Sequence, residues 1–386
     1  MTPVSDNPPL NIAIVSPYDF AYPGGVTNHV SNLAIKLIER GHSVKISAPY
    51  SLDHGASSNP IFHPIGKPIP VPTAGSVARI TLSVTLSKYV VPFLRENKFD
   101  IVHIHEPVSP TLPLTFLRLV QNSALVGTFH AYAKRRRSLS VSRYMLRRWA
   151  KRLDQRIAVS EAAHEYIQRY FPAEYDIIPN GVDVEYFSRQ SKFPKEFNDG
   201  KLNILFQGRM EKRKGFPHLL KAYSHVKWEY PNCRLLVVGP GNIDRESAQV
   251  ISERGLKDVH FVGFVSDEEL PKYYQMADIY CSPATGDESQ GIVLLQSMAA
   301  GTPILASSIP GYRTVISDNQ DGLLVDPWDE LEFSSKLLML LKNEGLRQRL
   351  STRARDTVKK YDWNTVTDQI EEKYRNALSL KLAQNV

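Results

Sequence analysis

The 386-residue sequence predicts an α/β protein made of two doubly wound, Rossmann-like domains that face each other across a cleft. Three observations support this fold class. Short β-branched runs alternate with amphipathic segments along the chain. The strand-like runs are apolar at nearly every position, as in parallel sheets that are covered on both faces. The series also begins twice, which indicates two sheets rather than one.

The first series starts with a strand at 11–16 and a helical pattern at 26–40. Further strands are expected at 43–48, 100–105, 124–129 and 155–160. The second series is expected to have strands at 202–208, 233–239, 258–263, 278–283, 303–307 and 322–325. Ligands of such sheets bind beyond the carboxyl ends of the strands, so the loops at those ends are the candidate sites.

The boundary between the domains is expected near 177–187, where a strand ends at Pro179, Asn180 and Gly181. We therefore expect an N-terminal domain at 1–182 and a C-terminal domain at 183–363. The last segment, 364–386, follows "YDWNTV" and is expected to cross back to the N-terminal domain.

Composition and charge narrow the class of protein. The chain is 42% hydrophobic and 23% charged, as in globular proteins. The net charge of +7 belongs to the first half, because residues 1–180 carry 20 Lys/Arg and 12 Asp/Glu. Such an excess favours an acidic partner such as a membrane surface or a phosphorylated ligand. Cys233 and Cys281 lie in apolar runs and are interpreted as buried free thiols. With neither a signal peptide nor a membrane-spanning run expected, the predicted location is cytoplasmic.

Two loops at strand ends carry phosphate-binding chemistry. Gly24 and Gly25 follow the first strand and open a helix, so they would let a phosphate approach the backbone N–H groups, although a simple glycine turn explains them equally well. The loop "GRMEKRKG" (208–215) follows the first strand of the second domain. There Arg209 and Lys214 would grip a diphosphate, and a solvated basic loop is the alternative.

Histidines gather after two strands of the first domain. His130 follows the strand at 124–129 and is a candidate site residue at the sheet edge. His103 and His105 are expected to pack or hydrogen-bond locally. Three histidines without supporting carboxylates do not indicate a metal site, so none is predicted.

The segment 134–156 holds ten basic residues and one acidic residue. Its apolar residues recur at helical spacing, which predicts a basic amphipathic helix after a basic loop. One interpretation is a helix packed on its own sheet with a solvated face; the other is contact with an anionic membrane, with shallow insertion of Trp149, Leu146 and Leu153. The predicted membrane-contact residues are Arg135, Arg136, Arg137, Arg147, Arg148, Trp149, Lys151 and Arg152. A nucleic-acid partner is not expected, since no known binding module accompanies the charge.

Several motifs together resemble one family. They are "PGGVTNHV", "TFHAY", "IAVSE", "IPNGVD", "GRMEKRKG" and "ESQGIVLLQSMAAGTP". In these the chain resembles the retaining glycosyltransferases of family 4, which have the GT-B fold. Within the family it is most similar to the phosphatidylinositol mannosyltransferases of actinobacterial type, with which it shares the short motifs "SPYDF", "GSVARI", "HEP" and "YDW".

The resemblance implies a role for each candidate residue. Gly24 and Gly25 would lie by the donor phosphate, Arg209 and Lys214 would bind the diphosphate, and His130 would contact the transferred sugar. Glu288 would hold sugar hydroxyls, and the N–H groups of Gln290, Gly291 and Ile292 would lie near sugar and phosphate. The catalytic set is thus His130, Arg209, Lys214 and Glu288, with Tyr18 and Asp19 as acceptor residues.

Gln296 departs from the family pattern, which has a second glutamate there to grip the nucleotide ribose. An amide oxygen also accepts a hydrogen bond from a hydroxyl, and the difference from a carboxylate is about 1–2 kcal/mol. That loss would fall on donor binding rather than on bond breaking, so we expect an active enzyme.

The resulting hypothesis is a retaining hexosyltransferase without a cofactor or metal. It would move mannose from GDP-mannose to an anionic lipid of phosphatidylinositol type, as a peripheral protein on the inner face of the cell membrane. A UDP-sugar donor with another lipid or a soluble acceptor is the alternative, and an inactive nucleotide-sugar-binding protein is a third possibility.

Overall fold

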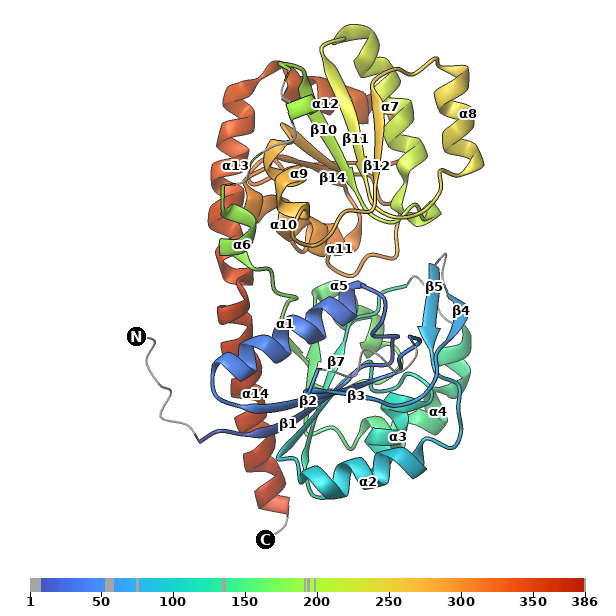
Figure 1. Ribbon diagram of the computed structural model, residues 1–386, viewed down its shortest axis with the longest axis vertical. Coiled ribbons are helices and arrows are strands. Elements are labelled where there is room, and N and C mark those ends of the chain that lie inside the picture. Colours follow the sequence, from blue (N-terminus) through green and yellow to red (C-terminus); the bar gives the residue numbers. More distant parts are fainter. Residues whose placement is uncertain are drawn as a thin grey trace. The chain divides into compact units, whose positions relative to one another are not determined.

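The computed structural model of the chain describes residues 8–52, 59–73, 76–133, 137–190, 192, 195–197 and 199–384. It divides into two compact units (Figure 1). Unit 1 comprises Met1–Asn180 and Trp363–Val386, and unit 2 comprises Gly181–Asp362.

Unit 1 contains a seven-stranded parallel sheet of order β3-β2-β1-β6-β7-β8-β9. Its strands are β1 Asn11–Val15, β2 Ser43–Ala48, β3 Phe62–Pro64, β6 Ile101–His105, β7 Ala124–Phe129, β8 Gln155–Ala158 and β9 Asp176–Ile177. An antiparallel hairpin pairs β4 Ile69–Thr73 with β5 Ser76–Ile80. The helices are α1 Gly25–Glu39, α2 Ser87–Asn97, α3 Leu112–Leu119, α4 Arg137–Ala150, α5 Glu161–Gln168 and α14 Trp363–Gln384.

Both faces of this sheet are buried. Ile12 and Ile14 of β1 point into a core shared with α1 and α14. Ala13 and Val15 point into the opposite core, which α2, α3 and α5 complete. Successive side chains of a strand point to opposite faces, so a strand with a core on each side is apolar throughout.

Unit 2 repeats the plan with a six-stranded parallel sheet of order β12-β11-β10-β13-β14-β15. The strands are β10 Leu202–Gln207, β11 Cys233–Val238, β12 Val259–Gly263, β13 Ile279–Ser282, β14 Ile304–Ser307 and β15 Leu323–Val325. The helices are α6 Val184–Ser188, α7 Phe216–Glu229, α8 Arg245–Glu253, α9 Leu270–Met276, α10 Ile292–Ala300, α11 Pro310–Arg313, α12 Glu330–Lys342 and α13 Glu344–Val358; the 3-10 turns are η1 Lys195–Phe197, η2 Lys212–Lys214 and η3 Lys359–Tyr361.

The predicted fold class, two doubly wound parallel sheets, is confirmed. The sequence did not reveal β3, β9 and the β4–β5 hairpin. Pro70 and Pro72 lie in β4 and argue against a strand in a sheet interior. They are tolerated because β4 pairs on one side only.

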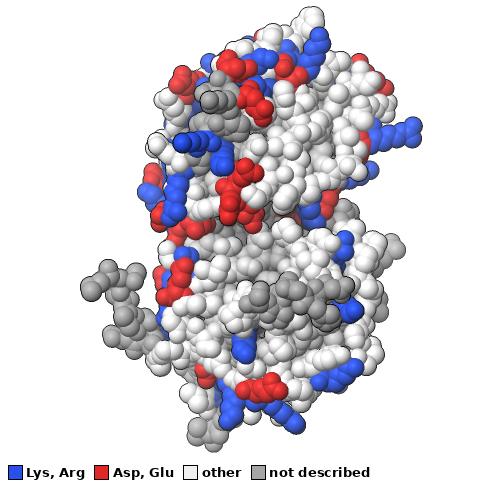
Figure 2. All heavy atoms as spheres, viewed as in Figure 1, with Lys and Arg blue, Asp and Glu red and all other residues white. Residues whose placement is uncertain are grey.

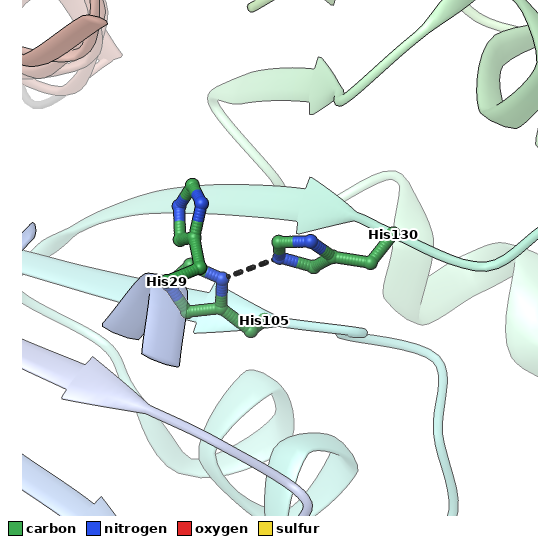
Figure 3. A group of neighbouring side chains, drawn as sticks. All are labelled: His29, His105 and His130. Carbon is green, nitrogen blue, oxygen red and sulfur yellow. Dashed lines mark hydrogen bonds between the residues drawn. The ribbon is translucent and has the colours of Figure 1, made fainter. Parts of the chain in front are cut away.

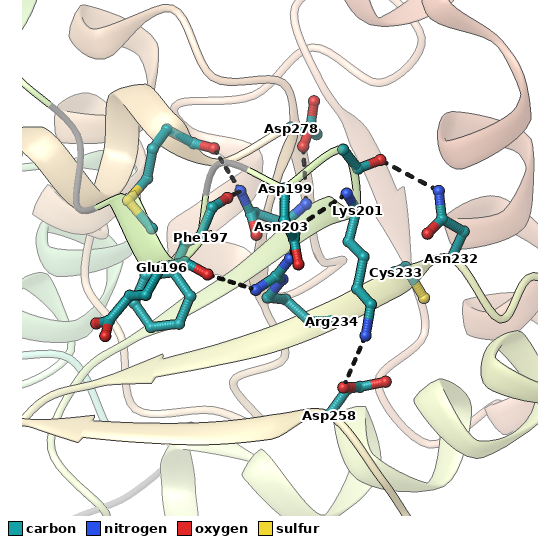
Figure 4. Close-up of polar contacts among 12 residues, drawn as sticks. Glu196, Phe197, Asp199, Lys201, Asn203, Asn232, Cys233, Arg234, Asp258 and Asp278 are labelled. Atoms are coloured by element: carbon teal, nitrogen blue, oxygen red, sulfur yellow. Dashed lines mark hydrogen bonds and ion pairs between the residues drawn. The ribbon is translucent and has the colours of Figure 1, made fainter.

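A network of polar contacts, which includes the buried Arg234 and Asn203, lies at the amino ends of the strands of unit 2 (Figure 4). Arg234 of β11 is buried, donates to the carbonyl of Glu196 at 3.2 Å and pairs with Asp199. Asn203 donates from Nδ2 to the carbonyl of Phe197 at 3.2 Å. These contacts fasten the segment that enters unit 2 to the sheet, at the edge opposite to the one that carries the sequence motifs.

Helix α14 belongs to unit 1 although it is last in the sequence. Its Tyr374 is buried, Glu371 contacts His42 Nε2 at 2.6 Å, and Lys373 pairs with Asp176 at 2.8 Å. Among the described residues, no helix has both the length and the apolar character needed to cross a membrane.

Candidate active site

Three histidines from separate elements of unit 1 meet at the carboxyl ends of β6 and β7 (Figure 3). His105 ends β6, His130 follows β7, and His29 comes from α1. His105 Nδ1 and His130 Nε2 are hydrogen-bonded at 2.8 Å, and His29 packs edge-on against both rings. The Glu106 carboxylate fixes the loop by accepting the N–H groups of His130 and Ala131, both at 2.7 Å.

His103 lies deeper in the same unit and is fully hydrogen-bonded. Its Nε2 contacts Thr128 Oγ1 at 2.7 Å, and its Nδ1 contacts Tyr374 OH at 2.8 Å. The prediction that His103 and His105 pack or hydrogen-bond locally is therefore confirmed. His29 was not among the predicted site residues, because its position in "GGVTNHV" fits the buried stripe of α1.

Burial controls the charge of these rings. Desolvation lowers the pKa of His29 to about 4 and that of His103 to about 3. Desolvation, reinforced by the neighbouring histidines, also lowers the pKa of His105 and His130 well below the usual value. All four rings are neutral at pH 7, so His130 can contact a sugar through a neutral nitrogen but does not offer a positive charge.

The candidate phosphate and acceptor loops of unit 1 follow β1. Gly24 is the N-cap of α1, where no side chain caps the helix. Its backbone is extended, and an added Cβ would meet only Thr27 Oγ1 at 3.5 Å, so packing does not demand the glycine. Gly25 begins the helix.

Of the two predicted acceptor residues, Asp19 is 2% exposed. Its Oδ1 accepts the N–H groups of Ala21 and Ser51, both at 3.1 Å. Its Oδ2 has no hydrogen-bond partner among the described residues. Tyr18 forms an isolated bridge with Ile80, which ties this loop to the hairpin.

In unit 2, the loop after β10 and the loop after β13 form one ion cluster. Glu288 Oε1 contacts Lys214 Nζ at 2.7 Å and Arg213 Nη1 at 2.6 Å. Glu211 joins Arg213 at 2.8 Å and Arg209 at 3.0 Å. The structure therefore brings together the predicted Arg209, Lys214 and Glu288. It adds Glu211 and Arg213, which share the quoted motif "GRMEKRKG" but were not singled out.

The cations keep Glu288 ionised. Burial alone would raise the pKa of this carboxyl, but Lys214 and Arg213 together hold it below its usual value. Gly215 lets the two loops approach: its φ is +69°, and an added Cβ would lie 1.9 Å from the carbonyl oxygen of Pro283. The sequence of this loop is therefore dictated by the close approach of the backbone as well as by charge.

Helix α10 starts beside Glu288. Gly291 is its N-cap with a φ of +90°, and an added Cβ would lie 2.6 Å from the ring of Tyr312. Gln290 is buried and Ile292 is the first helical residue. The helix has no side-chain cap. Backbone N–H groups at such an end are suited to bind anionic oxygen atoms.

Gln296 lies on α10 and is half-buried. Its Oε1 accepts a hydrogen bond from Tyr274 OH at 3.1 Å, and Tyr274 also contacts Gln207 Oε1 at 3.3 Å. A carbonyl oxygen has two lone pairs, so Gln296 retains capacity for a second donor such as a ribose hydroxyl.

The predicted basic helix is α4, and the basic side chains of this helix and of the two residues that follow it have two different environments. Arg147, Arg148 and Lys151 are exposed. In contrast, Arg152 donates to the carbonyls of Leu117, Arg118 and Val120 at the end of α3. Arg135 and Arg136 lie outside the described residues, as does the side chain of Arg137.

The expected apolar insertion of this helix needs correction. Leu153 is 3% exposed and belongs to the core, and Leu146 and Trp149 are half-buried against that core. The Trp149 ring also lies under the guanidinium groups of Arg148 and Arg118. Among the side chains of α4 that the structure describes, the exposed apolar ones are instead Tyr144, at 72%, and Met145, at 68%.

Lysine and arginine side chains on the face of the molecule shown in Figure 2 are scattered among uncharged and acidic ones. The basic side chains on this face therefore do not form one defined patch.

The two parallel sheets and the strand-end site define a glycosyltransferase of the GT-B class. Residues 23–186 match the model for "Glycosyltransferase Family 4" and residues 187–357 match that for "Glycosyl transferases group 1". The chain belongs to this glycosyltransferase family, as the motifs predicted.

Relatives and solved structures agree with the assignment. A "Phosphatidyl-myo-inositol mannosyltransferase" of Mycobacterium leprae is 36% identical over 95% of this chain and 96% of its own length. A "D-inositol 3-phosphate glycosyltransferase" of a Nocardioides species is 30% identical over 53% of this chain and 49% of its own length. A glycosyltransferase of Rickettsia africae has a similar fold, with a TM-score of 0.76 and 19% identity over 96% of this chain and 99% of that chain.

The buried histidines predict a pH-dependent stability. The pKa of His29 is about 4 and that of His103 about 3 in the folded protein, whereas both titrate near 6.5 when unfolded. Below pH 6.5 the unfolded chain binds protons that the folded chain does not, so the free energy of unfolding decreases from pH 7 towards pH 4. We expect a loss of about 2 kcal/mol per neutral histidine at pH 5.

Urea unfolding at pH 7 and pH 5 measures this change. Carboxyl groups with a lowered folded pKa contribute little over that interval, because they are largely ionised in both states. His103→Phe is expected to reduce the pH dependence, and His164→Gln, which alters a partly exposed ring, is the control. Equal stability of the wild type at the two pH values would contradict the expectation.

Proposed function

We propose that this protein is a retaining mannosyltransferase that moves mannose from GDP-mannose to a membrane lipid of phosphatidylinositol type. The observation that carries the proposal is the similarity to the Mycobacterium leprae protein named "Phosphatidyl-myo-inositol mannosyltransferase", which is 36% identical over 95% of the chain. The site geometry supports it. Unit 2 holds a cation cluster for a diphosphate together with Glu288 for sugar hydroxyls. Unit 1 holds the buried ring of His130 for the sugar and the buried carboxylate of Asp19 for the acceptor.

The proposed reaction needs a stabilised leaving group. The acceptor hydroxyl oxygen attacks the anomeric carbon on the face from which the diphosphate departs, so the configuration is retained. The bond between that carbon and the diphosphate oxygen breaks, and the acceptor proton passes to a phosphate oxygen. Arg209, Lys214 and the N-terminal N–H groups of α10 would stabilise the departing charge. In this proposal fixed cations take the place of a metal, and no cofactor takes part.

His130 and Glu288 would orient the transferred sugar. The neutral, buried ring of His130 suits a hydrogen bond to a sugar hydroxyl or a packing contact with the sugar ring. Glu288 Oε1 is occupied by two cations, and Oε2 makes no ion pair among the described residues. We propose that Oε2 accepts sugar hydroxyls while Oε1 keeps the carboxylate fixed beside Lys214.

The acceptor is proposed to bind at the loop after β1. Asp19 Oδ2 is buried without a hydrogen-bond partner among the described residues, so it is ready to accept a donor such as an inositol hydroxyl. The exposed Arg147 and Arg148 of α4, with Lys151 directly after the helix, would hold the protein on anionic lipid at the inner face of the cell membrane.

A soluble acceptor is the second candidate, and the Nocardioides relative named for D-inositol 3-phosphate favours it. A panel of GDP- and UDP-sugars, offered with phosphatidylinositol vesicles or with inositol phosphate and followed by mass analysis of the product, distinguishes the two. A mannosylated lipid formed only from GDP-mannose is the expected result. Failure to transfer or hydrolyse any donor would instead favour an inactive sugar-nucleotide-binding protein.

Removal of a leaving-group cation is expected to reduce transfer strongly. Arg209→Ala and Lys214→Ala should each lower kcat by about 100-fold or more, because each removes a charge aimed at the departing diphosphate. Lys212→Ala is the matched control, since this exposed lysine lies in the same 3-10 turn. Steady-state kinetics on folded variants provide the measurement, and wild-type turnover in Lys214→Ala would refute the assigned site.

Substitution of Gln296 tests its role toward the ribose. Gln296→Glu is expected to tighten donor binding by up to about tenfold or leave it unchanged, because a charged acceptor strengthens the hydrogen bond by about 1–2 kcal/mol at most. Gln296→Ala should weaken binding, which calorimetry with GDP or GDP-mannose measures. If the Gln296→Ala variant binds the donor as tightly as the wild type does, Gln296 does not contact the ribose, and its assigned role is wrong.

Membrane attachment is expected to depend on α4. Replacing Arg147, Arg148 and Lys151 by Ser should release the protein from anionic vesicles, since each basic residue near the surface contributes about 1 kcal/mol. The control replaces three exposed basic residues of unit 2, Arg349, Arg353 and Lys360, by Ser. Co-sedimentation at low and high salt provides the measurement. If the α4 variant binds vesicles as the control does, this helix is not the attachment surface.

A further inference from the structure

The rings of His29, His105 and His130 form a nearly equilateral triangle. Their centroids lie 4.9 Å apart for His29 and His130, 5.1 Å for His105 and His130, and 5.2 Å for His29 and His105. One ring nitrogen of each lies within 4.8 Å of the other two. It is the one group of this kind among the residues that the structure describes.

These separations match the geometry of a tetrahedral metal with three histidine ligands. A zinc–nitrogen bond of about 2.0–2.1 Å places each ring centroid about 3.2 Å from the metal, and hence neighbouring centroids about 5.2 Å apart. The ligand nitrogens would then be about 3.3 Å from one another. The rings thus already have the required spacing, and they need to rotate in place so that one nitrogen of each faces the centre.

The donor set also suits a metal. His105 Nε2 is buried without a hydrogen-bond partner among the described residues. Both ring nitrogens of His29 are likewise buried without a hydrogen bond of normal geometry there, although the nearby Asn180 side chain raises the pKa of His29. Because burial keeps the rings neutral at pH 7, their nitrogen lone pairs are available. Three imidazoles without a carboxylate favour Zn²⁺, Co²⁺ or Ni²⁺ over Mg²⁺ or Ca²⁺.

In the sequence, His103 stands with His105 and His130, and these three histidines without a supporting carboxylate predict no metal site. In the structure both nitrogens of His103 are occupied by Thr128 and Tyr374, and the third member of the group is His29 from α1. The His105–His130 hydrogen bond would be exchanged for two metal–nitrogen bonds.

We propose that His29, His105 and His130 form a binding site for one divalent transition metal ion of the zinc class, and that the bound ion withdraws His130 from the sugar and inhibits transfer. The binding site rests on the spacing of the three rings and on their available nitrogens, and it does not depend on the proposed function. The inhibition rests on the proposed function, which assigns His130 to the sugar.

Cobalt(II) titration of the tag-free, metal-stripped full chain tests binding without any use of activity. We expect one equivalent of Co²⁺ to bind with the intense visible absorption of a tetrahedral site, and Zn²⁺ to displace it. His29→Gln and His105→Gln should each weaken this binding by at least about tenfold, because each removes one of three ligands. His218→Gln and His225→Gln in unit 2 are matched controls that should bind as the wild type does.

A second measurement uses the wild type alone, in case a variant of these buried residues does not fold. In an NMR spectrum of histidine side-chain nitrogens, one equivalent of Zn²⁺ should shift the signals of three rings and leave the others in place. Absence of a tetrahedral Co²⁺ spectrum, or zinc shifts confined to other histidines, would overturn the site and leave aromatic packing as the reason for the triangle.

Transfer activity separates this inference from the proposed function. Inhibition by one equivalent of Zn²⁺, reversed by a chelator, is the expected result. If zinc binds at the three histidines but does not inhibit transfer, the metal site stands and the role assigned to His130 is wrong. If the protein transfers the sugar but binds no Co²⁺, the proposed function stands and the metal site is wrong.

Discussion

The carboxyl ends of parallel strands share one edge of a sheet, and the functional chemistry of this protein depends on that constraint. β6 and β7 pair in parallel with His105 opposite Thr128, so the residue two positions beyond Thr128, His130, reaches the ring of His105. In unit 2, β13 lies beside β10, and the loops that follow them bring Glu288 to Lys214. Residues far apart in the sequence thus meet because strand direction, rather than a local motif, sets their position.

Charge balance distinguishes the two groups of residues. Unit 1 surrounds its histidines with apolar core, so desolvation keeps them neutral. Unit 2 holds three cations, Arg209, Arg213 and Lys214, with two carboxylates, Glu211 and Glu288. The two carboxylates hold the three cations in place and leave a net charge of +1, so a diphosphate would find the cations pre-oriented. Pre-orientation of this kind lowers the reorganisation needed when charge develops on a leaving group.

The sequence revealed strands better than side-chain partners. Long apolar runs located eleven of the strands, because burial on both faces leaves a strong signal. Lys214 was located because its loop follows a strand end, whereas the role of Glu288 came from the resemblance to the family. The sequence did not show that Arg152 would cap α3 or that Leu153 would be buried, because helical spacing identifies an apolar face without identifying what covers it. His29 was overlooked for the same reason, since its place on the inner face of α1 gives no sign of the two strand-end histidines that it meets.

The last helix of the chain completes the core behind those histidines. Tyr374 of α14 contacts His103, which in turn contacts Thr128, two residues before His130. Trp363, at the start of the same helix, packs edge-on against His29 with ring centroids 5.1 Å apart. Two of the four buried histidines therefore have a neighbour that is synthesised only after the whole of unit 2. Since buried polar groups are stable only with their partners in place, unit 1 cannot reach its final packing until the C-terminal segment docks, and assembly of the histidine site is coupled to completion of the entire chain.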